Sequence, residues 1–315
     1  MTVVAERTES IRIANANFAT VGDYFTLLKP RVMSLVVFTG IAGLVLAPGH
    51  IALATAFTAL LSIAVGAGAS GALNMAYDSD IDALMARTKG RPVPQGHLTA
   101  SEATAFGVTL AVGAVTVMGL FVNPVAAALL AFTIGFYVFV YTMWLKRRTP
   151  QNIVIGGLAG ALPPAIGWAA VTGSLAVPPL VLVAIIFLWT PPHFWALSLY
   201  RAEEYARARV PMLPVVAGKT ETRRQIVIYT ALVVAMGFAP VVLGFAGPAY
   251  LSANAGIGVW FLVQSVRVAY ERNPEREPQA RRLFGVSILY LFALFAAILG
   301  EQAAGIAPLA PLIWR

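Results

Sequence analysis

The sequence predicts an all-α polytopic membrane protein, folded as a single bundle of nine transmembrane helices. Hydrophobic residues make up 59% of the 315 residues, and charged residues make up only 11%. The mean hydropathy of +0.78 is well above that of a soluble domain. Apolar runs of about 20 residues recur along the chain, and this is the length that crosses the hydrocarbon core of a bilayer.

The nine runs are bounded by charged residues, glycine or proline. We divide the chain into a polar N-terminal segment (1–22), the nine-helix domain (23–304) and a short C-terminal tail (305–315). Because the number of crossings is odd, the two ends lie on opposite sides of the membrane. The runs cover residues 30–47, 51–77, 102–122, 125–145, 153–172, 178–199, 225–246, 250–270 and 283–304.

The basic residues orient this bundle. Of the 22 lysines and arginines, all but Arg315 lie in the N-terminal region or around the loops after the second, fourth, sixth and eighth runs. The positive-inside rule therefore predicts that the N-terminus and these loops are cytoplasmic. The net charge of +8 is spread between apolar runs, which argues against nucleic-acid binding. The absence of cysteine excludes disulfides, thiolate metal sites and thiol nucleophiles.

The first two runs carry signals for their start and their packing. Pro30 stands in the first turn of the first run, where proline is well tolerated. Lys29 and Arg31 beside it suit either an anchor to lipid headgroups or a contact with an anionic ligand. Residues 66–71 of the second run are all Gly, Ala or Ser, so we expect a neighbouring helix to approach closely there.

The second run leads into a polar stretch, residues 74–92. If the helix continues, Asn74, Asp78 and Asp82 share one face because they are spaced by four residues, and Asp80 points elsewhere. Carboxylate and amide oxygens suit Mg²⁺, which takes its other ligands from water and phosphate. The alternative is a polar cap at the water boundary. Since a cap needs no such stripe, we predict a metal site at Asn74, Asp78 and Asp82.

Basic side chains around this stretch are candidates for holding a diphosphate, whose charge Mg²⁺ alone does not balance. Residues 146–148 are three consecutive cations at a membrane boundary, which is also the pattern of a topology signal. Asn152 begins the fifth run, where its side chain suits a helix cap or a ligand contact. The predicted diphosphate-binding residues are Lys29, Arg87, Arg91, Lys146, Arg147 and Asn152.

The fifth and sixth runs each contain a proline pair. Pro163-Pro164 in the glycine-rich fifth run predicts a broken or bent helix. In the sixth run His193 follows Pro191-Pro192 within an apolar stretch, and an ionisable residue at such depth is a functional candidate. The alternative is a structural histidine bonded to a carbonyl that the prolines leave free.

The loop after the sixth run offers a second polar surface. Arg201, Glu204 and Tyr205 are spaced for one helical face, and the alternative is a solvated amphipathic loop. The last three runs are expected to be scaffold, and residues 271–282 an ordinary charged loop. The chain has no Walker-type loop, dinucleotide-binding glycine turn or metalloprotease histidine pair.

These motifs resemble the intramembrane aromatic prenyltransferase superfamily of the UbiA type. Within it the chain is similar to the protohaem IX farnesyltransferases, or haem O synthases, from about residue 23 to the ninth run. The spacing Asn74-x3-Asp78-x3-Asp82 matches the first aspartate-rich motif of the superfamily. Glu204 stands where that family usually has aspartate. The more specific matches are Asp82-Ala-Leu-Met-Ala-Arg87-Thr-Lys-Gly-Arg91-Pro, Lys146-Arg147-Arg148-Thr149-Pro150-Gln151-Asn152 and Pro191-Pro192-His193-Phe194-Trp195.

The resemblance implies transfer of a farnesyl group from farnesyl diphosphate to a vinyl group of haem B, giving haem O for terminal oxidases. It implies Mg²⁺ as cofactor and haem B as substrate. Haem contact would fall to His193, Arg201, Glu204 and Tyr205. Tyr77, Tyr141 and Trp144 are candidates, by position only, for stabilising a prenyl cation.

The same resemblance implies a location in the bacterial inner membrane, or in the mitochondrial inner membrane of a eukaryote. The site would face the cytoplasm, and the lipid bilayer would be the surroundings. Haem A synthase or oxidase assembly proteins would be the protein partners.

Two other functions fit part of the sequence. A polyprenyltransferase for 4-hydroxybenzoate or another quinone precursor would share the aspartate motif but would not need His193. A transporter or lipid-binding membrane protein would need no intact carboxylates at Asp78 and Asp82.

Overall fold

The computed structural model describes residues 19–311. Most of the predicted polar segment 1–22 and the last residues of the tail 305–315 lie outside this range. Helix α2 (Val21–Leu27) begins two residues before the predicted start of the domain. Throughout the described residues every regular element is a helix, so the all-α prediction is confirmed.

Each of the nine predicted runs corresponds to a helix or to consecutive helices. The boundaries agree within a few residues, except that α13 and α16 begin several residues before the predicted run. The helices are α3 (Pro30–Leu46), α4 (Leu53–Tyr77), α6 (Ala100–Phe121), α7 (Pro124–Gly135) continued by η1 (Phe136–Trp144) and η2 (Leu145–Arg147), α8 (Asn152–Ala161) with α9 (Pro163–Thr172), α10 (Val177–Leu199), α13 (Gly218–Met236) with α14 (Ala239–Val242), α15 (Pro248–Ala269) and α16 (Pro278–Ala303).

The count of nine membrane spans is not confirmed. Within the described residues, seven helical segments are long and apolar enough to cross a membrane, and the bent pair α2–α3 makes eight. The helix predicted at 250–270 is present as α15, with 22 residues, but it is not among these eight. Its buried Asn254, Gln264 and Ser265 face the protein interior and lower its hydropathy.

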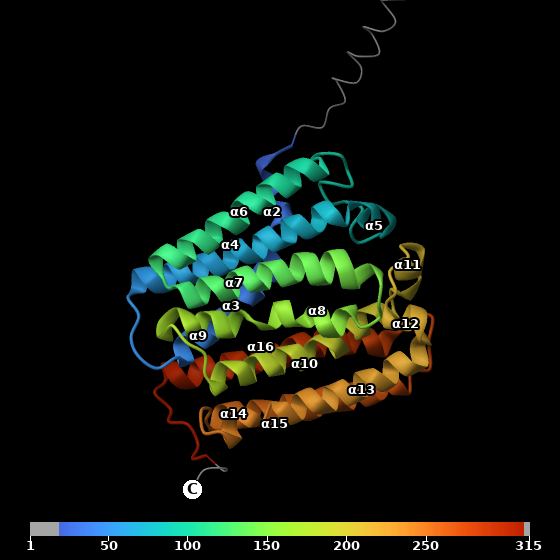
Figure 1. The fold of residues 1–315 in the computed structure, drawn as a ribbon. Coiled ribbons are helices and arrows are strands. Elements are labelled where there is room, and N and C mark those ends of the chain that lie inside the picture. The colour runs from blue at the N-terminus through green and yellow to red at the C-terminus, as the bar shows by residue number, and fades with distance from the viewer. Residues whose placement is uncertain (1–18, 312–315) are drawn as a thin grey trace, which may run out of the picture.

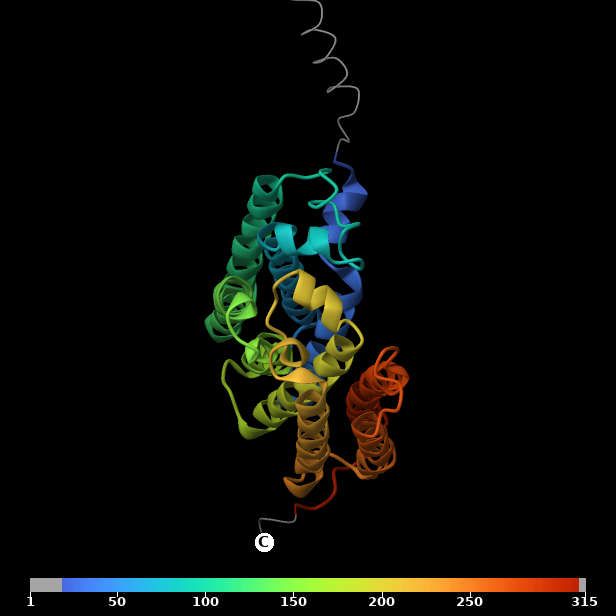
Figure 2. The ribbon, with the colours of Figure 1, turned by 90° about the vertical axis from the view of Figure 1, so that its right-hand side faces the viewer.

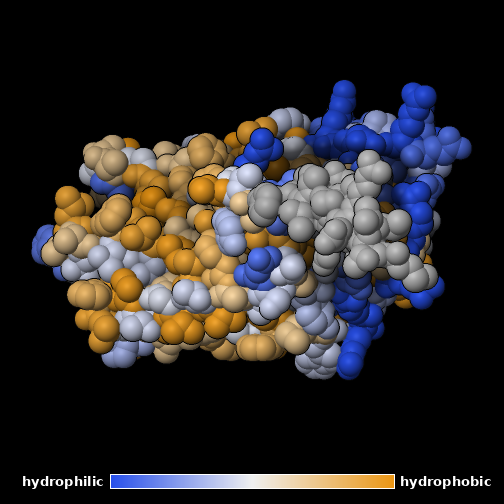
Figure 3. All heavy atoms as spheres, turned by 90° about the horizontal axis from the view of Figure 1, so that it is seen from above, coloured by the Kyte–Doolittle hydropathy of each residue, from blue (hydrophilic) through white to orange (hydrophobic). Residues whose placement is uncertain are grey.

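The long helices lie side by side in one bundle (Figure 1). Helices α6 and α4 form one edge, α7 to α10 and α16 the middle, and α13 and α15 the other edge. The short helices α5 (Ser79–Leu84), α11 (Ala202–Arg207) and α12 (Leu213–Val216) gather at one end, which we call the charged end (Figures 1 and 2). In a space-filling view the hydrophilic residues collect at this end and hydrophobic residues cover much of the remaining length (Figure 3).

Local sequence signals explain where several helices begin. Thr20 and Asp23 form a reciprocal capping box at the start of α2, and Thr99 and Glu102 form another at the start of α6. Pro30 opens α3, where its missing N–H has no intrahelical partner to lose. The residue before it, Lys29, has a φ of 54°. This left-handed residue separates α2 from α3 and makes a 49° bend between them.

The predicted break in the fifth run is confirmed. Helix α8 ends at Ala161 and α9 begins at Pro163, although the pair still counts as one candidate span. Helix α9 packs tightly on α3. A Cβ atom on Gly43 would lie 1.8 Å from the Pro164 carbonyl oxygen, and one on Gly167 would lie 2.1 Å from the Gly40 carbonyl oxygen. Only glycine permits such a close backbone approach.

The close approach predicted for residues 66–71 is also found. A Cβ atom on Gly68 would lie 3.0 Å from the Leu28 side chain, and one on Gly71 would lie 3.1 Å from the Leu27 carbonyl oxygen. The junction between α2 and α3 therefore rests on the glycine face of α4. This contact carries Lys29 to the end of α4 where the aspartates begin.

Candidate active site

The predicted aspartate stripe lies at a junction between two helices, so the single continuous helix that would place its three residues on one face is not present. Helix α4 ends at Tyr77, and α5 begins at Ser79 after Asp78. The backbone hydrogen bonds nevertheless keep helical spacing, since Asp78 N donates to Asn74 O at 2.9 Å and Asp82 N donates to Asp78 O at 2.8 Å. All three side chains of the stripe are buried, and Asp78 is 0% exposed.

Asn74 and Asp78 are bonded to each other and to cations from two other segments. The Asn74 Nδ2 donates to Asp78 Oδ2 at 2.7 Å, and Lys29 Nζ donates to Asn74 Oδ1 at 2.6 Å. Lys146 Nζ donates to the same Asp78 oxygen. Asn74 Nδ2 also lies 3.2 Å from Thr142 Oγ1 of η1. Residues far apart in the sequence thus converge on one buried amide–carboxylate pair.

Asp82 and Arg91 form a second ion pair, with 2.5 Å between Asp82 Oδ2 and Arg91 Nη1. The loop after α5 returns Arg91 to the stripe, and Thr88 Oγ1 fixes that loop by donating to the Asp82 carbonyl oxygen at 2.9 Å. The predicted neighbours Lys29, Lys146 and Arg91 are therefore all brought to the stripe.

Arg147 is engaged mainly with Asp80. Its two terminal nitrogens lie 2.8 and 2.7 Å from the two Asp80 carboxylate oxygens, and its guanidinium stacks over the Tyr77 ring. A longer contact of 3.6 Å joins Arg147 to Asp78. The hydrogen bonds from Arg147 hold the pKa of Asp80 below its ordinary value. Asp80 is largely exposed and points away from the stripe, as the sequence predicts.

Two further predicted diphosphate residues occupy other surroundings. Arg87 Nη2 donates to the Tyr205 hydroxyl at 2.7 Å, so it joins α11 rather than the aspartates. Asn152, the first residue of α8, is 0% exposed, and its Nδ2 donates to the Thr149 carbonyl oxygen at 2.5 Å. The Oδ1 atom of Asn152 is buried and has no hydrogen-bond partner in the described residues.

The predicted haem-contact residues fall into two groups. Arg201 donates to the Glu204 carboxylate, and Tyr205 follows on the same short helix at the charged end. His193 lies apart, between α10 and α16. Its ring stacks on Trp189 at 4.3 Å and on Phe284 at 4.4 Å between centroids.

The groups that hold His193 come from α16 and have no signal in the sequence around residue 193. Its Nδ1 lies 2.7 Å from the Ser287 Oγ, and Ser287 in turn donates to the Phe284 carbonyl oxygen at 2.7 Å. Trp189 Nε1 donates to the Ser287 carbonyl oxygen at 2.7 Å. No local pattern links residues 189–193 to 284–287, because the packing of two distant helices creates the contact.

The aromatic candidates also differ in placement. Tyr141 packs on Tyr137 at 5.2 Å between ring centroids and lies against Gly156 of α8. Trp144 is 53% exposed, and Tyr77 carries Arg147 on its ring. Tyr141 is therefore the only one of the three candidates whose ring packs in the interior.

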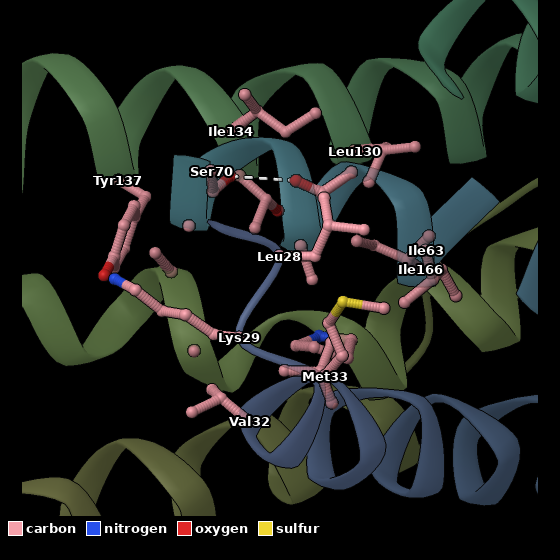
Figure 4. Close-up of a pocket in the computed structure, with 18 residues that line it drawn as sticks. Leu28, Lys29, Val32, Met33, Ile63, Ser70, Leu130, Ile134, Tyr137 and Ile166 are labelled. Atoms are coloured by element: carbon pink, nitrogen blue, oxygen red, sulfur yellow. Dashed lines mark hydrogen bonds between the residues drawn. The ribbon is translucent and has the colours of Figure 1, made fainter. Parts of the chain in front are cut away.

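An apolar cavity of about 120 Å³ extends from Lys29 into the bundle. In Figure 4 the tips of Lys29 and Tyr137 point toward each other at one end, and Ile63, Ile166 and Leu130 lie at the other. Helices α3, α4, α7 with η1, and α8 with α9 surround it. Lys29 belongs both to this cavity and to the polar cluster around Asn74.

The donor atoms of the stripe fit Mg²⁺. In the described part of the chain no group of three His, Cys, Asp or Glu side chains is arranged to hold a metal. Mg²⁺ needs fewer protein ligands, however, since it binds one or two carboxylates and keeps water or phosphate oxygens. Among the described residues Asp78 Oδ1 is buried without a hydrogen-bond partner, and its nearest cation, Arg147 Nη2, is 3.6 Å away, so this hard oxygen is available to such a metal ion.

Comparison with known proteins agrees with this architecture. The model of the UbiA prenyltransferase family matches residues 36–289. A protoheme IX farnesyltransferase of Parvibaculum lavamentivorans is 57% identical over 306 residues, which is 97% of this chain and 96% of that protein.

Two solved structures share the fold. A digeranylgeranylglyceryl phosphate synthase superposes with a TM-score of 0.72 at 20% identity, over 89% of this chain and 99% of the other. A UbiA homologue from Archaeoglobus fulgidus, bound to DMAPP and Mg²⁺, gives a TM-score of 0.63 at 16% identity, over 88% and 99%. The chain therefore belongs to the UbiA prenyltransferase family, among its protohaem IX farnesyltransferases.

Proposed function

We propose that this protein transfers the farnesyl group of farnesyl diphosphate to a vinyl group of haem B and releases diphosphate. The observation that carries the proposal is the position of Lys29. Its ammonium joins the polar cluster of Asn74, Asp78 and Lys146 to the mouth of the apolar cavity. A molecule with a diphosphate head and a hydrocarbon tail matches both environments at once.

The polar cluster would bind and stabilise the leaving group. Asn74, Asp78 and Asp82 would hold Mg²⁺ on the diphosphate oxygens. When bound, Mg²⁺ supplies Lewis-acid stabilisation of the charge that grows on the leaving oxygen. Lys29, Lys146 and Arg91 would add fixed positive charge at the same oxygens, which lowers the barrier because these groups are already in place.

The allylic carbon–oxygen bond breaks, and its electron pair leaves with diphosphate. The π electrons of the haem vinyl group then form the new carbon–carbon bond, and the resulting cation takes up water and releases a proton. The farnesyl cation must meet the vinyl group before water does, so the dry walls of the cavity protect the reaction. Tyr137 lines the cavity, where its ring could stabilise positive charge, and Tyr141 packs on Tyr137 from outside the cavity lining.

Haem would be bound by His193 and by the charged residues of α11. His193 uses Nδ1 for its hydrogen bond with Ser287. Its other ring nitrogen, Nε2, takes no part in that bond and suits contact with the porphyrin or its iron. Arg201, Glu204 and Tyr205 would lie at the polar side of the acceptor. Haem O made in the bilayer would pass to haem A synthase or to oxidase assembly proteins.

The experiment that tests this function is haem extraction and mass analysis from cells expressing the chain with Asp78 or with Asp78→Ala. Haem O is expected only with the native residue. Prenylation of a quinone precursor, with no haem O, would favour the aromatic polyprenyltransferase. Haem O made equally by both forms would overturn the role of the aspartate stripe.

We further propose nine membrane crossings, with the charged end in the cytoplasm of a bacterial inner membrane. The clustering of hydrophilic residues at that end supports this orientation (Figure 3). Because the chain has no cysteine, single cysteines at Ser174 and Glu275 report the two sides without background. An impermeant thiol reagent on intact cells is expected to label Ser174→Cys but not Glu275→Cys. The opposite labelling, or labelling of both, would overturn the orientation.

A further inference from the structure

Another pocket lies where α15 ends and α16 begins, at the charged end of the bundle. It has a volume of about 350 Å³ and shares no lining residue with the apolar cavity below Lys29. The candidate active site uses none of its side chains. The lining residues are Val266, Arg267, Tyr270, Glu271, Arg272 and Gln279.

The two arginines of this pocket have no carboxylate partner. In the described part of the chain, neither Arg267 nor Arg272 forms a salt bridge. Glu271 is the only carboxylate that lines the pocket, and its two oxygens accept from the backbone amides of Asn273 and Gln279, each at 2.9 Å. The pocket therefore keeps a net positive charge, and its guanidinium N–H groups suit an oxyanion.

A buried side chain positions Arg267. The amide of Gln264, which is 4% exposed, satisfies its neighbours when its oxygen faces Arg267 and Trp260. In that orientation it accepts from Arg267 Nη1 at 3.1 Å and from Trp260 Nε1 at 3.2 Å. One N–H of the guanidinium thus holds it at the edge of the pocket, and its remaining donors are left for a ligand.

An apolar face of α15 leads to these arginines. Val259, Val263 and Val266, which we call the valine stripe, are 42–59% exposed, and Tyr270 is 79% exposed. Spacings of three and four residues place all four side chains on one face. They extend along about 16 Å of helix, close to one leaflet of a hydrocarbon core of about 30 Å. Because the opposite face of α15 packs on α13 and α16 at the edge of the bundle (Figure 1), the stripe faces outward.

We infer that the pocket and the valine stripe together bind one anionic phospholipid, with its phosphate between Arg267 and Arg272. A soluble phosphate would use only the arginines, whereas the continuous apolar stripe beside them matches a molecule that joins an anionic head to hydrocarbon chains. Tyr270 stands between the two parts, at the level where aromatic rings favour the membrane interface. The inference goes beyond prenyl transfer and requires only that α15 lies in the bilayer.

The test adds dioleoyl phosphatidylglycerol or dioleoyl phosphatidylcholine to the full chain in an uncharged detergent, without donor or haem. The melting temperature is followed against lipid concentration. Phosphatidylglycerol should raise it at lower concentration than phosphatidylcholine, whose choline group cancels the phosphate charge. In Arg267→Gln/Arg272→Gln, the phosphatidylglycerol concentration that gives half of the shift should rise about tenfold, because two charge-assisted contacts are lost.

The double variant Arg276→Gln/Arg282→Gln is the matched control. It removes the same charge from exposed positions four and ten residues after Arg272, and neither residue lines the pocket. It should keep the native concentration dependence. Native mass spectrometry should count one phosphatidylglycerol fewer on the pocket variant than on this control. Equal weakening in both variants would mean attraction to net charge alone and would overturn the site, as would equal shifts with the two lipids in the native protein.

The headgroup without its chains tests the apolar half. Glycerol 3-phosphate is expected to leave the melting temperature unchanged at concentrations where phosphatidylglycerol has its full effect. An equal shift with this compound would assign the pocket to a soluble phosphate and overturn lipid binding. The proposed function is judged apart from this test, since the pocket variant lies outside the candidate active site and should make haem O as the native protein does.

Discussion

The ammonium of Lys29 lies 2.6 Å from the amide oxygen of Asn74, 45 residues away in the sequence. This bond exists because Lys29 adopts a left-handed conformation between α2 and α3, with a φ of 54°. It ties the first bent helix pair of the bundle to the end of α4. The same ammonium stands at the mouth of the apolar cavity, so one side chain links the polar and apolar halves of the site.

We expect Lys29→Gly to weaken farnesyl diphosphate binding while the fold is kept. Glycine adopts a positive φ at no steric cost, so this variant removes the charge without adding strain. Lys29→Ala removes the same charge and keeps the Cβ atom that lysine already carries at this positive φ. Isothermal titration should show at least a tenfold loss of diphosphate affinity in both. Because the backbone strain is unchanged in the alanine variant and relieved in the glycine variant, neither should melt far below the native protein, and native affinity in either variant would contradict the role of the ammonium.

Asp78→Asn is expected to abolish turnover, since it removes the buried charge that would hold Mg²⁺ and that pairs with Lys146. Asp80→Asn is the matched control, because Asp80 is two residues away but largely exposed. It should keep most of the activity. Haem O is quantified by mass spectrometry, and equal activity of the two variants would argue against the stripe as the metal site.

Removal of divalent cations is expected to stop the reaction and to weaken donor binding, but not to unfold the protein. Lys146 and Arg91 already neutralise Asp78 and Asp82, so the fold does not depend on the metal. Titration with EDTA followed by Mg²⁺ should abolish and then restore haem O formation. Circular dichroism should stay constant through the cycle, and loss of helix on chelation would contradict this independence.

Ser287→Ala is expected to weaken haem binding by freeing the imidazole of His193 to rotate. The Ser287 hydroxyl holds Nδ1 and donates to the Phe284 carbonyl oxygen, which favours a proton on Nδ1 and a free Nε2. The readout is the Soret spectrum of the purified protein titrated with haem B.

The control for this variant is Ser265→Ala. Ser265 is buried and makes the same kind of bond to the carbonyl three residues earlier, at 2.8 Å, but touches no histidine. It should leave the spectrum unchanged. His193→Ala should lose the spectral change that native protein shows, and added imidazole should restore it in part. Identical spectra for all three variants would remove His193 from the acceptor site.

Glu301→Gln is expected to lower stability by about 1–3 kcal/mol, because a charged acceptor of two backbone donors becomes neutral. The Glu301 carboxylate accepts from the amides of Gly247 and Tyr250 at 2.7 and 2.8 Å, and so caps the start of α15. Thermal unfolding in detergent measures the change. The neighbouring exposed Gln302→Ala is the control, and an equal shift in both would contradict the cap.

Much of the fold follows from hydropathy alone, because each long helix must present an apolar surface to lipid or to its neighbours. The helical spacing of Asn74, Asp78 and Asp82 is also predicted from the sequence, because i to i−4 backbone hydrogen bonds continue across the break between α4 and α5. The sequence does not predict that break, since it depends on how α5 packs rather than on a local proline or glycine. The sequence does predict Lys29, Arg91 and Lys146 as neighbours of the stripe. It does not predict which side chain each of them contacts, because Lys29 and Lys146 lie 45 and 68 residues from their partners.

Residues 271–282 show most clearly that a local sequence pattern does not predict contacts with a distant helix. This segment was expected to be an ordinary charged loop, yet Glu277 is 0% exposed. Arg223 and Lys219 of α13 lie 2.7 and 3.2 Å from its carboxylate. Burial of this residue depends on two cations in another helix, and no local periodicity reports such a contact.

The ion pairs at the stripe have one more consequence. Lys146 and Arg91 are already paired with Asp78 and Asp82. A phosphate ion without a metal would therefore have to compete with these carboxylates for the two cations. Under the proposed function, a diphosphate that arrives together with Mg²⁺ would bring a new cation for the aspartates and free the lysine and arginine to bind its own oxygens. This exchange of ion-pair partners would favour the metal-loaded donor over inorganic anions.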